Sequence, residues 1–377
     1  MQTLELTRVN ELPSPTWNRL DINGHTLEVP TDALHDEQAL AKVAADAAAA
    51  YVKRPCEQSM EERSGLRSGV GAAAQAWLEA ACSNPASIAV TDARTSREPI
   101  ELVASPGLGT LDTSIALDAG QTLDVAIVAG PDAASMHTSG ALTKLSLAEG
   151  SHARVHVLVA LPDECRHIND LQIELGDHAV VDVTYHLLGA GRCVAGMDID
   201  CAGYRSVCHV DVRYLTRDTE VLDMNYVMRL RGRKSTATFD AYGVMGGTST
   251  KTLRDTIDLV HGGKGAAGRE QETVLLTSQG VTNKSLPVVL CDEDDVAGEH
   301  GATIGTVSPD QLAYLRARGL TEDEAQALFG RSVLDSAIAH SATPAARAAA
   351  LALAERVLGV EAAGEIAGVA DDAEGTR

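Results

Sequence analysis

The sequence predicts a mainly β protein in which a parallel β-helix lies between an N-terminal and a C-terminal helical region. Two observations lead to this fold class. From about Ile88 to Thr306, runs of alternating apolar and polar residues are separated by glycine turns, a pattern typical of strands. Before and after this stretch, apolar residues recur every three or four positions, as they do on one face of a helix.

The strand region contains a repeat, which is the third observation. Four segments share a glycine-centred turn between two sets of apolar alternations, and their glycines, spaced 30, 26 and 27 residues apart, are Gly120, Gly150, Gly176 and Gly203. A propeller blade needs about 40–45 residues, and a β-sandwich shows turns about every 8–12 residues without a longer repeat. One β-helix coil per repeat fits best, and residues 87–306 are predicted to form the coils. Because the ends of such a stack are exposed strand edges, we expect the helical regions to cap them.

Residues 1–86 are predicted to form an irregular and helical N-terminal region. Residues 1–30 show no clear period. Apolar residues on one face then predict a helix from Asp36 to Lys53, which Pro55 ends. A second helix is expected at about Gly69–Cys82.

Residues 307–360 are predicted to be helical, and the first helix has clear signals at both ends. Ser308 and Gln311 have the spacing of a capping box, in which two side chains satisfy free backbone N–H groups. Gly319 is placed to end this helix, because glycine adopts the left-handed conformation that commonly follows a helix.

Two further helices and a tail are expected after it. Thr321 and Glu324 repeat the capping box, and Thr343 opens a helix rich in Ala and Leu that runs to about Leu358. Residues 361–377 consist largely of Ala, Gly, Asp and Glu, and we expect a disordered acidic tail there.

The composition argues against several classes of function. The net charge is −22 and the pI is about 4.9. These values disfavour a nucleic-acid partner, because phosphate binding needs clustered Lys and Arg. No apolar run approaches the ~20 residues of a membrane span, and the N-terminus lacks the features of a signal peptide. We therefore expect a cytoplasmic protein that binds neither nucleic acid nor membrane.

The sequence also lacks the common catalytic and metal-binding motifs. Its seven cysteines show no CxxC spacing, which disfavours a disulfide framework or a self-contained zinc or iron–sulfur ligand set. The GxSxG, HExxH and kinase motifs are absent. Because no self-sufficient catalytic set is present, we expect the chain not to be an enzyme.

The junction between the strands and the C-terminal helices carries the main candidate site. Glu299 and His300 lie between Gly298 and Gly301. An imidazole can bind a metal or transfer a proton near neutral pH. In a regular strand these two side chains would face opposite sides, unless the glycines permit a bulge. The alternative is a structural histidine that is hydrogen-bonded at a domain junction.

Cys291 is a second candidate in the same region. A thiolate close in sequence to His300 suggests a soft pair of metal ligands. Residues 292–295 are all acidic, however, and this environment disfavours a reactive thiolate. The alternative is a buried cysteine at a strand end beside a solvated acidic turn.

Several segments around this junction follow one another in a recognisable order. They read DDV at Asp294–Val296, HGATIG at His300–Gly305 and DQLAYLRARGLTEDEAQ at Asp310–Gln326. Upstream, NKSLP at Asn283–Pro287 adds to the agreement, and the strong match covers about Thr273–Ala327. In these motifs the chain resembles the SufB/SufD family of iron–sulfur cluster assembly proteins, and within it the SufD type.

The resemblance implies a right-handed parallel β-helix between helical regions and a non-catalytic scaffold role. It implies that the chain pairs with a SufB-like subunit through the β-helix and binds a SufC-like ATPase through residues 307–360. The implied docking residues for the ATPase are Gln311, Leu312, Tyr314, Leu315, Arg318, Gly319, Glu324 and Ala325.

The resemblance also assigns a role to the junction site. His300 takes the place of a family histidine that lies at the subunit interface and is implicated in holding the nascent cluster. Glu299 and Cys291 are the accompanying candidates. A transient iron–sulfur cluster at the interface is therefore expected, no tightly bound cofactor is expected on the chain alone, and no flavin is assigned.

The chain departs from the family pattern in two places, and other functions stay open. Gly298 stands where SufD proteins commonly carry a cysteine, and no cysteine occurs near Ser285 and Leu286, where SufB-like proteins tend to carry one. A SufD-type subunit is favoured, and a homodimeric SufB-like scaffold is the alternative. A carbohydrate-acting β-helix protein would need an aromatic-lined groove, which 3% aromatic residues disfavour. A purely structural interaction platform is the last alternative.

Overall fold

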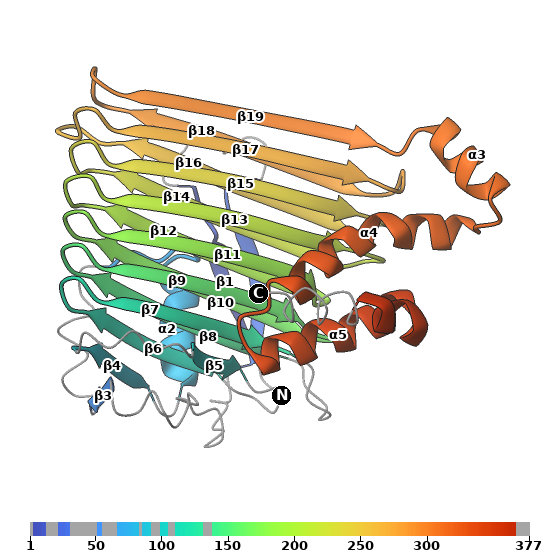
Figure 1. Ribbon diagram of the computed structural model, residues 1–377, viewed down its shortest axis with the longest axis horizontal. Coiled ribbons are helices and arrows are strands. Elements are labelled where there is room, and N and C mark those ends of the chain that lie inside the picture. The colour runs from blue at the N-terminus through green and yellow to red at the C-terminus, as the bar shows by residue number, and fades with distance from the viewer. Residues whose placement is uncertain are drawn as a thin grey trace.

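The structure is a computed structural model of the 377-residue chain. It describes residues 3–12, 22–30, 51–54, 66–82, 85–91, 99–104, 110–130 and 138–366. Two long parallel sheets form a β-helix, and helices lie along its sides (Figure 1). The mainly β fold class and the parallel β-helix predicted from the sequence are confirmed.

The chain alternates between the two sheets, so consecutive strands lie in opposite sheets and each strand pairs with the strand one coil earlier. One sheet, here called the even sheet, contains β4 (Ala86–Val90), β6 (Thr110–Leu117), β8 (Thr138–Leu147), β10 (Arg166–Leu175), β12 (Arg192–Cys201), β14 (Val221–Leu230), β16 (Thr250–Leu259) and β18 (Thr282–Cys291). The other, the odd sheet, contains β5 (Ile100–Ala104), β7 (Thr122–Ala129), β9 (His152–Ala160), β11 (Val180–Gly189), β13 (Val207–Thr216), β15 (Thr236–Met245), β17 (Ala267–Leu276) and β19 (Ala297–Thr306).

The core lies between the two sheets. Alternate residues of every strand point inward, and those of the central coils are almost all apolar and buried. Tyr185, Tyr226 and Phe239 lie at the centre of this core, where the rings of Tyr185 and Tyr226 are 5.4 Å apart and those of Tyr226 and Phe239 are 5.8 Å apart. Small and branched aliphatic side chains fill the remaining interior, as the low aromatic content of the sequence requires.

The N-terminal region differs from the irregular chain predicted for residues 1–30. β1 (Thr3–Val9) and β2 (His25–Pro30) form an antiparallel pair. They pack, together with α2 (Ala72–Ala81), on the outer face of the even sheet through an apolar cluster that includes Leu142 and Val194. α2 confirms the helix expected at about Gly69–Cys82.

The helix predicted at Asp36–Lys53 is wrong at its C-terminal end. Tyr51–Arg54 forms β3, which pairs antiparallel with β4 at the edge of the even sheet. A strand here satisfies backbone groups of β4 that would otherwise form a free edge, and this outweighs local helix propensity. Residues 36–50 of that prediction lie outside the described residues.

The C-terminal helices begin where the sequence places them. α3 (Pro309–Ala317) and α4 (Glu322–Ala339) start with the capping boxes of Ser308 and Thr321, and α5 (Pro344–Leu358) starts after Thr343. The disordered tail predicted for residues 361–377 is wrong at its start, and residues 367–377 of that prediction lie outside the described residues. Residues 360–366 are helical, and Ala363 and Ile366 are buried in the same apolar cluster as α4 and α5.

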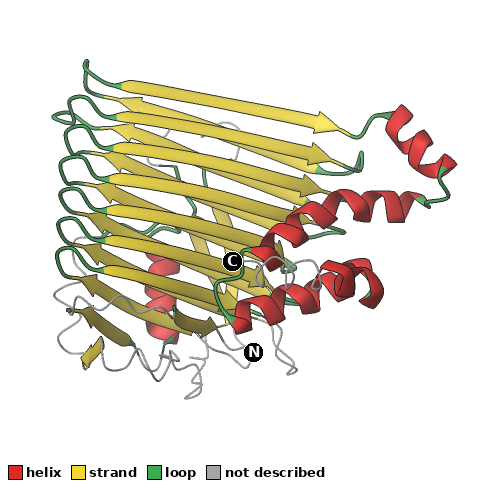
Figure 2. Cartoon of the chain, viewed as in Figure 1, coloured by secondary structure: helices red, strands yellow, loops and turns green. Residues whose placement is uncertain are grey.

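None of the described helices caps an end of the stack, contrary to the expectation from the sequence. α4 and α5 lie along the outer face of the odd sheet, where they bury Val128, Leu158 and Leu188 (Figures 1 and 2). The odd sheet presents apolar residues outward along five neighbouring strands, and covering this face with α4 and α5 removes them from water. In the described part of the chain, no helix is both long and apolar enough to cross a membrane.

Candidate functional site

The last coil of the β-helix, formed by β18 and β19, is the open end of the molecule. Each of the two strands lies at the end of its sheet and pairs with a described strand on one side only. In β16 nearly every residue is buried, whereas in β19 eight of ten are exposed. Ile304 pairs with the buried core residue Val274 and continues its inward row, yet 56% of Ile304 is exposed. An inward apolar side chain without a coil above it marks a surface that another molecule can cover.

His300 belongs to the inward row of β19. It pairs in register with Glu270, which is 3% exposed. The charge of the imidazole acts to lower the pKa of the Glu270 carboxyl group. Glu299 pairs with the exposed Arg269 and therefore lies in the outward row. The register of β17 and β19 runs without a shift from Ala267 onward. Because no bulge forms, Glu299 and His300 face opposite sides of the strand.

The interior just below His300 is polar, unlike the core of the central coils. Lys251 Nζ donates hydrogen bonds to Glu272 Oε1 at 2.5 Å and to Ser285 Oγ at 3.0 Å. Tyr214 Oη donates to the same Glu272 oxygen at 2.9 Å. Burial lowers the pKa of Lys251, and the adjacent Glu272 carboxylate opposes this shift. A paired ammonium and carboxylate are the form in which buried charges persist.

A second acidic pair lies beside this network. The carboxyl groups of Asp255 and Glu270 interact directly, and each affects the pKa of the other. Burial, together with the Glu270 charge, raises the pKa of Asp255 well above its usual value, and burial also raises the pKa of Glu270. Asp255 Oδ2, Glu270 Oε2 and Glu272 Oε2 have no hydrogen-bond partner among the described residues. Buried oxygens usually accept a hydrogen bond, so three unpaired carboxyl oxygens close together are unusual in a protein interior.

Cys291 ends β18 and is exposed rather than buried. Its thiol donates to the backbone carbonyl of Glu293 at 3.3 Å. Within the described ranges, no three His, Cys, Asp or Glu side chains are grouped so that they could hold a metal ion. The open end therefore offers His300 and Cys291 as separate exposed ligands and not as a complete set.

The residues predicted to bind an ATPase partner lie on α3 and at the start of α4, which project from the side of the β-helix (Figure 1). Tyr314 is 57% exposed, and the guanidinium of Arg318 lies 5.2 Å from the centre of its ring. Gln311 and Glu324 hold capping boxes, and Gly319 has a φ of 96° that suits glycine. Leu312 and Leu315 are half-buried, whereas Ala325 is fully buried and cannot contact a partner directly.

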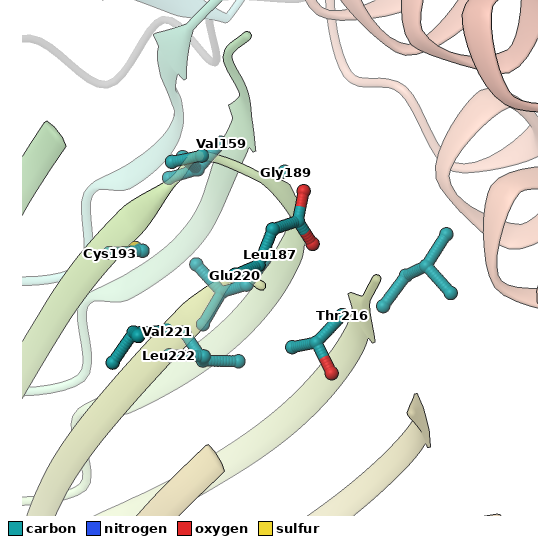
Figure 3. A pocket seen from close by; sticks show the side chains of 10 residues that line it. Val159, Leu187, Gly189, Cys193, Thr216, Glu220, Val221 and Leu222 are labelled. Atoms are coloured by element: carbon teal, nitrogen blue, oxygen red, sulfur yellow. The ribbon is translucent and has the colours of Figure 1, made fainter. Parts of the chain in front are cut away.

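The pocket drawn in Figure 3 lies where the odd strands end and the chain turns back to the even sheet, and it offers no room for a ligand. It is lined by Val159, Leu187, Cys193 and Glu220, among others, and its volume is about 10 Å³. That is room for about one water molecule. Burial raises the pKa of the Glu220 carboxyl to about 7, and its oxygens accept hydrogen bonds from Arg217. These hydrogen bonds hold the turn between β13 and β14 against the interior.

Sequence reasoning identified His300 and Cys291 but missed the polar network beneath them. A signal was present: Lys251 and Asp255 are spaced by four in one strand pattern, and Glu270 and Glu272 by two in the next, so each pair shares a face. Charged residues at inward positions of consecutive strands are rare in a solenoid core. These four lie in the coil directly before the last one.

Comparison with known proteins places these features in a family. The model of the SUF system FeS cluster assembly, SufBD core domain, matches residues 108–333, more than half of the chain. The iron-sulfur cluster assembly protein SufD of Bacillus subtilis is 33% identical over 97 residues, which cover 26% of this chain and 22% of that protein. A SufBD family protein of Mycobacterium bovis is 41% identical over 80 residues, or 20% of this chain and 10% of the relative. The matched segments thus span less than a quarter of the relatives' own length.

Proposed function

Because the chain belongs to the SufBD core family of SUF-system iron–sulfur cluster assembly proteins, we propose that it is a non-catalytic scaffold subunit of an assembly complex. The observation that carries the proposal is the open last coil, in which His300 and Ile304 continue inward rows without a coil above them. A scaffold that is completed by another subunit needs such a surface.

The proposed partner at this end is a SufB-like subunit. β18 and β19 each leave one edge unpaired by the described strands, and free strand edges favour pairing with another chain. A partner that continues the two sheets would cover Ile304 and close the polar interior around Glu270 and Glu272. A second copy of this chain is the alternative occupant, as a homodimeric SufB-like scaffold.

His300 is proposed to supply one ligand to an iron–sulfur cluster that forms transiently at this interface, the cluster being cargo and not a resident cofactor. Imidazole nitrogen and cysteine thiolate are both suitable ligands for iron. Since His300 and Cys291 are the exposed histidine and cysteine side chains of the last coil, and no complete metal-ligand group occurs in the described residues, the remaining ligands are proposed to come from the partner subunit. Glu299 faces away from His300 and is the weakest member of the proposed set.

The proposed second partner is a SufC-like ATPase that binds α3 and the start of α4. Tyr314 and Leu328 expose large apolar surface there, 57% and 44% respectively. Arg318, stacked on Tyr314, adds a charge beside this surface. Such a helix docks by its apolar face into a groove of the partner. The complex is proposed to act in the cytoplasm.

Co-expression with a SufB-like and a SufC-like subunit tests the proposal. We expect the three chains to elute together from a size-exclusion column. In that complex His300→Ala is expected to reduce cluster yield, measured by absorbance after reconstitution with iron and sulfide, at least tenfold. Its melting temperature is expected to stay within a few degrees of the parent. Elution of this chain alone, or an equal loss of melting temperature and cluster yield, would contradict the proposal.

A further inference from the structure

The turns that lead from the even sheet to the odd sheet form a second, separate surface. They stack along one edge of the β-helix, at the left of Figures 1 and 2. The backbone N–H of each turn donates to a carbonyl of the next turn, from His178 to Tyr204 at 2.8 Å, from Arg205 to Arg233 at 3.0 Å and from Lys234 to Lys264 at 2.9 Å. These bonds hold the turns as a rigid ladder, with neighbouring turns about 4.8 Å apart.

Four cations occupy three consecutive turns of this ladder. Arg205, Arg233, Lys234 and Lys264 are all exposed, and none forms an ion pair with a carboxylate of the described residues. Tyr204 is 37% exposed, and the Arg205 guanidinium lies 5.3 Å from the centre of its ring. We call these five residues the basic stripe. Like charges stacked on neighbouring turns repel one another. In a chain of net charge −22, cations that are not paired with a carboxylate are unexpected.

The backbone of the stripe is strained as well. Arg205 has a φ of 54° and Lys234 a φ of 56°, in the left-handed region that disfavours side chains. The equivalent position is glycine in three other turns, namely Gly120, Gly150 and Gly265, and it is His178, with a φ of 57°, in a fourth. Glycine is therefore sufficient to build the turn. Cations at these two positions reduce stability twice, through strain and through repulsion, so their side chains serve something other than the fold.

Carboxylates bound the stripe on both sides. Glu149 and Asp177 lie in the turns before it, and Asp294 and Asp295 lie in the turn after it. A long uniform polyanion, such as a nucleic acid, or a broad anionic membrane would meet these carboxylates as it followed the ladder. A ligand with a short run of negative charge would not.

We propose that the basic stripe binds a short acidic segment of a partner polypeptide. Three to four carboxylates of an extended segment would face the four cations, and the ring of Tyr204 would contact an apolar side chain of the same segment. The stripe ends one turn before the turn of the last coil and lies at the opposite edge of the coils from α3, so this partner is proposed to bind in addition to the two subunits proposed above.

The test uses the full chain, a fluorescein-labelled peptide of four glutamates and one leucine, and fluorescence anisotropy at low salt. The double variant R205G/K234G removes two cations and relieves the strained backbone. We expect its affinity for the peptide to fall at least tenfold while its melting temperature does not fall. The control variant R154A/R269A removes two exposed arginines that pair with Asp124 and Asp240, and we expect it to retain the peptide affinity.

Two further measurements keep the inference open to refutation. Added salt is expected to weaken the peptide complex, because the contact is between exposed charges. Equal affinity of the parent and R205G/K234G for the peptide would overturn the inference. Binding of single-stranded DNA or of phosphatidylserine vesicles as tight as that of the peptide would also overturn it. Co-elution with the SufB-like and SufC-like subunits is expected to be unchanged in R205G/K234G, so the two proposals fail separately.

Discussion

In the central coils and in the last coil of the β-helix, strands pair with their neighbours in the same register. The two regions differ in how much of their surface is covered by neighbouring strands. β14 pairs on both edges and has eight of ten residues buried, whereas β19 pairs on one edge and has none buried. The interior of the central coils is apolar around Tyr226 and Phe239, while Lys251 and Glu272 fill the interior near the open end. The central coils thus bury their own apolar surface and the last coil does not. This difference is the basis of the proposal that the central coils provide stability and the last coil provides a binding surface.

The same substitution in one inward row would separate the two roles. Val274 is 1% exposed and Ile304, directly beside it in the next coil, is 56% exposed. Val274→Asp is expected to lower the free energy of unfolding by about 4 kcal/mol or more, because it buries an unpaired charge. Ile304→Asp is expected to change it by less than about 1 kcal/mol, since water solvates the new carboxylate.

Urea denaturation of the isolated variants measures both values, and co-elution measures the consequence for assembly. Ile304→Asp is expected to abolish binding of the SufB-like subunit although the chain stays folded. If Ile304→Asp bound that subunit normally, the last coil would not be the binding surface. If Val274→Asp were as stable as the parent, the coils would not depend on a buried core at this position.

Substitutions in the buried ion pair of Lys251 and Glu272 test whether the interior near the open end also contributes to stability. Lys251→Met leaves the Glu272 carboxylate buried without its ammonium partner, and such a change typically costs about 3–5 kcal/mol. The double variant K251M/E272M removes both charges and is expected to recover most of that loss. Urea denaturation of the parent, the single and the double variant checks this, and a single variant as stable as the parent would show that solvent reaches the pair.

The covered side of the central coils should respond to acid. His186 lies on β11 beneath α4, with Nε2 3.4 Å from Ser336 Oγ, and faces His156, His340 and Arg213. Burial first, and then these neighbouring charges, lower the pKa of His186 to about 3. The unfolded chain therefore takes up a proton near pH 6.5 that the folded chain does not, so this contribution to stability falls as the pH drops below about 6.5.

Other groups also change the stability with pH. The raised pKa of Glu220, for example, makes the folded state more stable as the pH falls, which is opposite to the effect of His186. Replacing His186 and comparing the variant with the parent isolates the contribution of this histidine. Between pH 7.5 and pH 5, the stability of His186→Leu relative to the parent is expected to rise by about 2 kcal/mol. Urea denaturation of both proteins at the two pH values measures the change. A difference that stays constant with pH would mean that His186 is protonated in the folded chain.

The repeat and the helix caps could be predicted because both depend on local residue patterns. The spacing of Gly120, Gly150, Gly176 and Gly203 reflects the turns that separate the coils, and all four begin or lie within tight turns of the ladder. The placement of α4 and α5 could not be predicted in the same way. It depends on the apolar outer face of the odd sheet, which becomes visible only when strands far apart in sequence are aligned.

The candidate site was only partly predictable for a related reason. His300 and Cys291 stand out as residue types, and their neighbourhood can be read from the sequence. The burial of Glu270 beneath His300 and the exposure of Ile304 follow from register and from the absence of a further described strand, which no single strand pattern contains. The pairing of Tyr51–Arg54 with β4 escaped prediction because it too depends on a distant sheet edge.

Hydrogen exchange of the backbone amides tests the central claim most directly. The amides of β18 and β19 in the isolated chain are compared with those in the complex with a SufB-like subunit, and β12 and β13 serve as internal controls. The account predicts strong new protection of β18 and β19 on complex formation, with β12 and β13 unchanged. Formation of the complex without added protection in β18 or β19 would contradict it.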